Sequence, residues 1–169
     1  MVKKQILEKE LDKCELVNKA NLHIPINSTF VFISVTVLTF IISTNNQILK
    51  DDLFLALQIA LCIPFFIYSN IARSRVAISP SKAVDNFGSW IYTFGLIFFL
   101  NTAGILLATL AYTNLGIIFI TTVIVLTLFY ESLAKPTHSE EIFGFKIKRW
   151  LILLIGFVLL GLLPILGVY

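Results

Sequence analysis

Charged residues are scarce in this sequence, because Asp, Glu, Lys and Arg make up only 14% of its 169 residues. Soluble domains are typically about 25% charged and about 45–50% apolar. Here 57% of the residues are apolar and the mean hydropathy is +0.90. A soluble fold of this size cannot bury that much apolar surface. The composition therefore excludes an ordinary soluble domain and predicts that lipid surrounds most of the chain.

Cysteine and histidine are also rare, which limits metal and redox chemistry. Cys14 lies in a polar N-terminal segment and Cys62 in an apolar run, so we expect no disulfide between them. His23 and His138 form no ligand spacing with these cysteines, and we predict neither a metal site nor a cofactor. The sequence also lacks a Ser/His/Asp order, an H-E-x-x-H motif and a glycine-rich phosphate loop, so no catalytic residue is assigned.

No charged residue occurs between Asn86 and Tyr130, a run of 45 residues. One membrane-spanning helix needs about 20 apolar residues, so this run predicts two crossings joined by a turn near residues 112–116. Similar runs elsewhere predict an all-α, polytopic membrane protein with five transmembrane helices, at residues 28–44, 53–72, 88–111, 116–133 and 150–168. No charge falls in the core of these predicted helices, which disfavours proton pumps and voltage sensors.

The chain ahead of the predicted transmembrane domain, residues 23–169, has a different character. Residues 1–22 predict an amphipathic helix on the cytoplasmic side, and they are too charged for a cleavable signal peptide. Pro25 is expected to end this helix, with Asn27 or Ser28 capping the first crossing. Further along, Ser79 followed by Pro80 has the form of an N-cap and predicts a short interfacial helix before residue 88.

The distribution of Lys and Arg predicts the orientation of the chain. With five crossings, all 13 basic residues except Lys50 fall in the N-terminus, the second connection or the fourth connection, which share one side. Basic residues accumulate on the cytoplasmic side of membranes. We therefore predict a multi-pass protein of the cell membrane, with the N-terminus cytoplasmic and the C-terminus external. The net charge of +3 then reflects topology, and we expect no nucleic-acid partner.

Small and hydroxyl-bearing residues recur every seven positions in two predicted helices. Membrane helices associate through such close-packing seams rather than through burial of apolar area. We expect these seams to face the protein interior, although Ser and Thr hydroxyls can instead bond to their own helix and face any direction. The seams are Gly88, Gly95, Thr102 and Thr109 in one helix, and Thr29, Thr36 and Ser43, with Thr39 alongside, in the other.

Polar residues within the predicted membrane core form a candidate binding site. Two carboxamides, Gln58 and Asn101, lie in apolar runs, and an unpaired polar group in hydrocarbon costs several kcal/mol. The functional interpretation is a midplane site for a small solute or ion; the alternative, which we favour, is structural hydrogen bonding between helices. The candidate residues are Thr36, Gln58, Asn101, Thr121 and Thr122.

Charged residues cluster on the predicted cytoplasmic face. Basic side chains beside carboxylates could hold a lipid phosphate, although interface loops are charged simply because they touch water and headgroups. The cluster comprises Arg73, Arg75, Lys82, Asp85, Glu131, His138, Glu140 and Glu141. The residues that we expect to contact lipid headgroups are Arg73, Arg75, Lys82, Lys146, Lys148 and Arg149.

These features predict a small non-enzymatic membrane protein that acts as a subunit of a membrane complex or as a self-assembling module. Membrane lipids and either further copies of the chain or other subunits are the expected partners. One alternative is an oligomeric channel or facilitator with a polar midplane. A second alternative is an enzyme that acts on lipids through the charged cytoplasmic loops.

Overall fold

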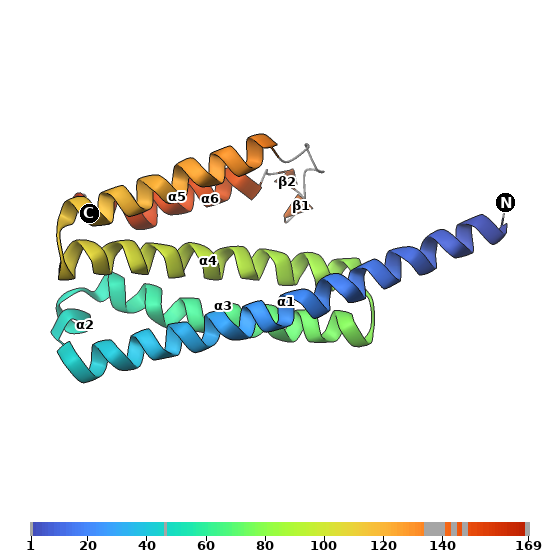
Figure 1. Ribbon diagram of the computed structural model, residues 1–169, viewed down its shortest axis with the longest axis horizontal. Coiled ribbons are helices and arrows are strands. Elements are labelled where there is room, and N and C mark those ends of the chain that lie inside the picture. The colour runs from blue at the N-terminus through green and yellow to red at the C-terminus, as the bar shows by residue number, and fades with distance from the viewer. Residues whose placement is uncertain (1, 46, 134–140, 143–144, 147–148, 168–169) are drawn as a thin grey trace. The chain divides into compact units, whose positions relative to one another are not determined.

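The computed structural model describes residues 2–45, 47–133, 141–142, 145–146 and 149–167, and these are almost entirely helical (Figure 1). The two strands among them are two residues long and pair antiparallel, with Glu141 opposite Lys146. The predicted all-α class is therefore confirmed. The elements in chain order are α1 (Val2–Asn45), α2 (Gln47–Asp51), α3 (Leu53–Ile78), α4 (Lys82–Leu110), α5 (Thr113–Leu133), β1 (Glu141–Ile142), β2 (Phe145–Lys146), α6 (Arg149–Phe157), the π-helix η1 (Val158–Leu162) and α7 (Leu163–Ile165).

Three helices of the described chain are long and apolar enough to cross a membrane, which indicates a membrane protein. They are the Glu10–Thr44 part of α1, together with α3 and α4. Two further apolar segments, Thr113–Phe129 and Trp150–Ile165, are shorter. The longest uncharged run of the sequence thus forms most of α4 and α5. The turn between them is at residues 111–112, shorter and earlier than the predicted turn at residues 112–116, because α5 already begins at Thr113.

The chain divides into two compact units, Met1–Leu96 and Ile97–Tyr169. The first unit contains α1, α2, α3 and the N-terminal half of α4. The second contains the remainder of α4, the helices α5, α6 and α7, and the π-helix η1. Each unit is described by itself below.

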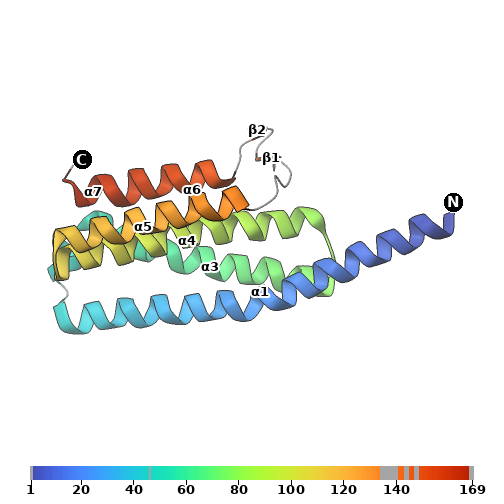
Figure 2. The ribbon, with the colours of Figure 1, turned by 45° about the horizontal axis from the view of Figure 1, so that its top comes forward.

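Helix α1 is continuous through Pro25, so the predicted interruption at this residue is wrong (Figure 2). Proline inside a helix removes one backbone hydrogen bond and crowds the preceding turn. Here α1 packs along α3 and remains helical on both sides of the proline. Asn27 and Ser28 consequently lie inside a helix rather than capping one.

The boundary between α3 and α4 also differs from the expectation. Helix α3 continues to Ile78, and Ser79 ends it by donating its backbone N–H to the carbonyl of Arg75 at 2.8 Å, instead of capping a new helix. The predicted short interfacial helix is the first part of α4, which begins at Lys82. Because both helices are longer than predicted, Arg73 and Asp85 lie within helices and not in a loop.

The predicted seam of α4 is buried at Gly88, Gly95 and Thr102, whereas Thr109 is exposed. Within the first unit, a Cβ at Gly95 would lie 3.1 Å from the ring of Phe66, which shows how closely α3 and α4 approach. Phe66 also stacks on Phe30 of α1, with ring centroids 5.0 Å apart. Small residues in α4 therefore make room for the aromatic core of this unit.

The predicted seam of α1 is wrong, because Thr29, Thr36, Thr39 and Ser43 are all exposed. Their hydroxyls donate to carbonyls of their own helix; that of Thr36, for example, contacts the carbonyl of Phe32 at 2.8 Å. The buried face of α1 has the same seven-residue spacing but is offset from the predicted seam by two positions towards the N-terminus. It comprises Ala20, Asn27, Ser34 and Ile41. A shift of two positions is about 200° around a helix, which exchanges the inner and outer faces.

Candidate functional site

The C-terminal turns of α3 and the N-terminal turns of α4 carry the charged centre of the first unit. A short connection at residues 79–81 turns the chain back on itself, so that Arg73 and Asp85, twelve residues apart, face one another. The guanidinium of Arg73 donates through Nη1 to Oδ1 of Asp85. Both side chains are almost completely buried, with 2% and 5% of their surfaces exposed.

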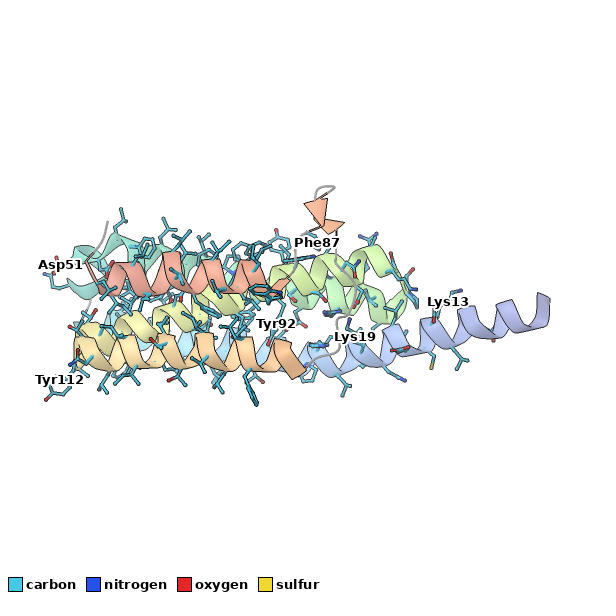
Figure 3. The ribbon with its side chains drawn as sticks, turned by 90° about the horizontal axis from the view of Figure 1, so that it is seen from above. Lys13, Lys19, Asp51, Phe87, Tyr92 and Tyr112 are labelled. Atoms are coloured by element: carbon cyan, nitrogen blue, oxygen red, sulfur yellow. The ribbon has the colours of Figure 1, made fainter. Side chains whose placement is uncertain are left out.

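Two more residues complete this group, which we call the charge network: Lys19, Arg73, Asp85 and Ser89. Nη2 of Arg73 donates to Oγ of Ser89 at 2.5 Å, one turn further along α4. Nζ of Lys19 on α1 lies 2.9 Å from Oδ2 of Asp85, and its side chain is about half exposed at 47%. Figure 3 labels Lys19 on α1. One carboxylate thus binds two cations, and the charge network joins three helices.

A second polar layer lies beside the charge network. Nδ2 of Asn27 on α1 donates to Oγ of Ser69 on α3 at 3.0 Å, and that hydroxyl donates to the backbone carbonyl of Gly88 on α4 at 2.8 Å. All three residues are buried. A Cβ at Gly88 would lie 3.0 Å from Cβ of Ala72, so the glycine permits the close helix approach that this chain of hydrogen bonds requires.

A buried ion pair stabilises a fold only when its partners stay together. Removing two charges from water is costly, and their attraction repays that cost only with good geometry and additional hydrogen bonds. Here the carboxylate of Asp85 contacts two cations, and Ser89 provides a further acceptor for the guanidinium. The arrangement suits a structural clamp between helices. It leaves Asp85 poorly placed for acid–base chemistry on an external substrate, because its side chain is only 5% exposed and contacts two cations.

The predicted headgroup-binding residues fall in different environments. Arg73 is buried and belongs to the charge network. Arg75 and Lys82 are exposed, and Lys82 lies 3.2 Å from the carboxylate of Asp12. Lys148 and the side chains of Lys146 and Arg149 lie outside the described residues. A headgroup role stays a prediction for all of these residues. Of the other predicted cluster members, His138 and Glu140 and the side chains of Glu131 and Glu141 also lie outside the described part of the chain.

The predicted midplane residues divide between interior and surface positions. In the first unit Gln58 is buried, whereas Thr36 is exposed. In the second unit Asn101 is buried and its Nδ2 donates to the carbonyl of Gly156 at 3.1 Å, whereas Thr121 and Thr122 are exposed. Solute binding by these five residues stays a prediction. The contact made by Asn101 is of the helix-joining kind that the sequence favoured.

Sequence analysis missed Lys19, Asn27, Ser69 and Ser89 as interacting residues. Three of them are small or polar residues in apolar surroundings, which are frequent in membrane helices and carry no chemistry by type alone. The sequence feature that could have identified Asn27 as buried is its seven-residue spacing with Ala20, Ser34 and Ile41. Over the described residues, no three His, Cys, Asp or Glu side chains lie close enough to hold a metal ion.

Comparison with known proteins suggests no function for these residues. The sequence matches no known family, no characterised protein and no solved structure.

Proposed function

We propose that this chain is a polytopic protein of the cell membrane that acts without catalysis, as a subunit or self-assembling module of a membrane complex. The observation that carries the proposal is the closed charge network. The enzyme alternative requires an accessible basic residue beside a carboxylate. In the strongest such pair, Arg73 with Asp85, both side chains are almost completely buried. What the long helices present outward is mainly apolar.

The outward-facing side chains support association within a membrane. Large apolar residues are more than half exposed on helices of both units, including Phe32 at 72%, Phe40 at 62% and Phe129 at 61%. A monomeric soluble protein seldom exposes so many large apolar side chains, and lipid or neighbouring helices are the media that accept them. Lipids and further copies of the chain, or other membrane subunits, are therefore the partners that we propose.

We also propose five crossings, with the N-terminus cytoplasmic and the C-terminus external. Helix α5 has 21 residues and a length of about 32 Å, enough to cross a hydrocarbon layer of about 30 Å. The α6–η1–α7 segment is shorter, at about 25 Å for residues 149–165, and local thinning of the bilayer can accommodate this difference. The concentration of basic residues on alternate connections supports the direction of insertion.

One observation favours the channel alternative. Asn101 is completely buried in the second unit and packs beside a π-helix, an element that occurs frequently at functional sites. In this alternative a solute pathway would run between copies of the chain. Flux of small solutes into proteoliposomes tests this alternative directly.

Cysteine cross-linking tests self-assembly. In a background lacking Cys14 and Cys62, Phe40→Cys and Phe129→Cys place thiols on exposed positions, and Ile120→Cys provides a buried control. Oxidation in native membranes should yield disulfide-linked species with at least one exposed position and none with the control. Native mass spectrometry of the parent chain should then show a dimer or larger assembly, or a defined partner. A monomer that forms no cross-link and retains no partner would contradict the proposal.

A further inference from the structure

His23 lies on α1 between the two sets of polar contacts that join this helix to its neighbours. Lys19, His23 and Asn27 are spaced by four positions and therefore share one face of α1. On one side of His23, Lys19 contacts Asp85 of α4. On the other side, Asn27 contacts Ser69 of α3. A change in the charge of His23 therefore acts on the interface of α1 with both helices.

The side chain of His23 is half-buried and packs against α4. Its imidazole ring lies edge-on to the ring of Tyr92, with centroids 6.2 Å apart and planes inclined at 64° (Figure 3 labels Tyr92). Tyr92 also contacts Phe30 of α1 and Phe66 of α3, with centroids 6.1 and 5.8 Å away. The imidazole therefore lies beside the aromatic core of the first unit, where a charged ring is less well solvated than in water.

The charged groups around His23 carry an excess of positive charge. Lys19 on its own helix and Arg73 on α3 both act on the imidazole and oppose its protonation. On α4, the carboxylate of Asp85 is shared between these same two cations. The phenol of Tyr92, which contacts the ring, stays neutral at physiological pH. A protonated His23 would therefore be a third cation beside a single anion.

These surroundings predict how the stability of the interface depends on pH. His23 precedes the first proposed crossing, which begins at residue 28. Burial, followed by the charges of Arg73 and Lys19, holds the pKa of His23 below its ordinary value of 6.5. When α1 is detached, the imidazole regains the ordinary pKa and binds a proton first as the pH falls. The contact is therefore fully stable above that value and loses stability as the pH falls from there to the lowered pKa.

We propose that His23 makes the attachment of the N-terminal part of α1 sensitive to acid. At neutral pH the uncharged ring packs on Tyr92, and the charge network holds α1 against α3 and α4. In acid, protonation places a third cation beside Lys19 and Arg73, and this part of α1 separates from α3 and α4. Given the proposed orientation, the signal is acidification of the cytoplasm.

The first test measures the free energy of unfolding of the full-length protein in mixed micelles between about pH 7.5 and 5.5, above the range in which most Asp and Glu side chains titrate. Wild-type protein should lose stability as the pH falls over this interval. His23→Gln keeps a polar side chain that cannot be protonated and should remove most of that loss. His138→Gln changes the other histidine of the sequence and should leave the loss unchanged.

The second test detects separation of α1 directly. In a background lacking Cys14 and Cys62, Ala20→Cys places a thiol on the fully buried face of α1. Cys14, in a chain lacking only Cys62, reports the labelling rate of an exposed thiol on the same helix. The ratio of the two maleimide labelling rates corrects for the effect of pH on thiol reactivity. It should rise severalfold from pH 7.5 to 5.5, and it should stay constant when His23→Gln is added.

Two results would overturn the inference. One is a loss of stability in His23→Gln equal to that of wild type, a result that does not depend on how Ala20→Cys folds. The other is a labelling ratio that does not change with pH while His23 is present. Both tests are made in detergent, where both ends of the helices meet the same pH, so neither depends on the proposed orientation. A chain that responds to pH through His23 but never assembles would contradict the proposed function alone.

Discussion

Arg73 on α3 and Asp85 on α4 form a buried ion pair across the short connection between the two helices. The pair neutralises two charges at the adjacent ends of two long apolar helices, where either charge alone would oppose burial. Lys19 extends the pairing to α1, and Ser89 orients the guanidinium. The charge network thereby joins the end of α3, the start of α4 and α1 within the first unit.

Separating this ion pair should destabilise the protein strongly. Asp85→Asn leaves the buried guanidinium of Arg73 without a counter-charge, and loss of one partner of a buried pair costs about 3–5 kcal/mol. The double variant Arg73→Met/Asp85→Leu removes both buried charges and should lose less than either Asp85→Asn or Arg73→Met alone. Reversible unfolding in mixed micelles measures all four proteins. Additive losses in the double variant would show that the two residues do not act as a pair.

The hydrogen bonds of Ser69 should contribute measurably, unlike those of the outward-facing threonines. Ser69→Ala removes the acceptor for Asn27 and the donor to the carbonyl of Gly88, and should cost about 1–2 kcal/mol. Thr36→Val removes a hydroxyl that bonds only its own helix and should change stability by less than about 0.5 kcal/mol. The same unfolding assay compares them. Equal losses would mean that hydroxyl bonds between helices hold this unit no better than local ones.

Two glycines in the second unit should differ in their tolerance of alanine. A Cβ at Gly116 would lie 2.6 Å from the backbone carbonyl of Gly104, which cannot move without shifting a helix. A Cβ at Gly104 would lie 2.6 Å from both Cγ1 and Cδ1 of the buried Ile120, and a side chain can shift more readily than a backbone carbonyl. Gly116→Ala should therefore cost about 1–3 kcal/mol and Gly104→Ala less, as measured by thermal unfolding in detergent. The reverse order would contradict this account of the α4–α5 contact.

The natural cysteines provide a direct test of topology. Cys14 is exposed and Cys62 is buried, so a membrane-impermeant maleimide should label Cys14 in inverted membrane vesicles but not in intact cells. Tyr112→Cys, in a chain lacking Cys14, should show the opposite pattern, because Tyr112 is exposed in the α4–α5 turn (Figure 3). Labelling of both positions from the same side would contradict the proposed orientation of the first three crossings.

The seam of α4 could be predicted from the sequence, whereas that of α1 could not. In α4 Gly88 and Gly95 share one heptad register with Thr102, so this face was evident before any partner was known, although the buried Gly104 lies outside that register. In α1 two registers compete: Thr29, Thr36 and Ser43 on one face, and Ala20, Asn27, Ser34 and Ile41 on the other. Both contain mainly small or polar residues, and a hydroxyl satisfied by its own helix can face lipid. Local pattern therefore could not choose between them.

The sequence by itself determined that the chain is helical and that its long helices have membrane length, because scarcity of charge and the lengths of uncharged runs depend only on the order of residues. Tertiary structure alone decided which face of α1 is buried and which charges are paired. The physical reason is that lipid and protein interior are almost equally apolar, so burial does not rank the faces of a membrane helix. The choice depends on the groups that a neighbouring helix presents: in this protein Ser69 for Asn27, and Arg73 for Asp85.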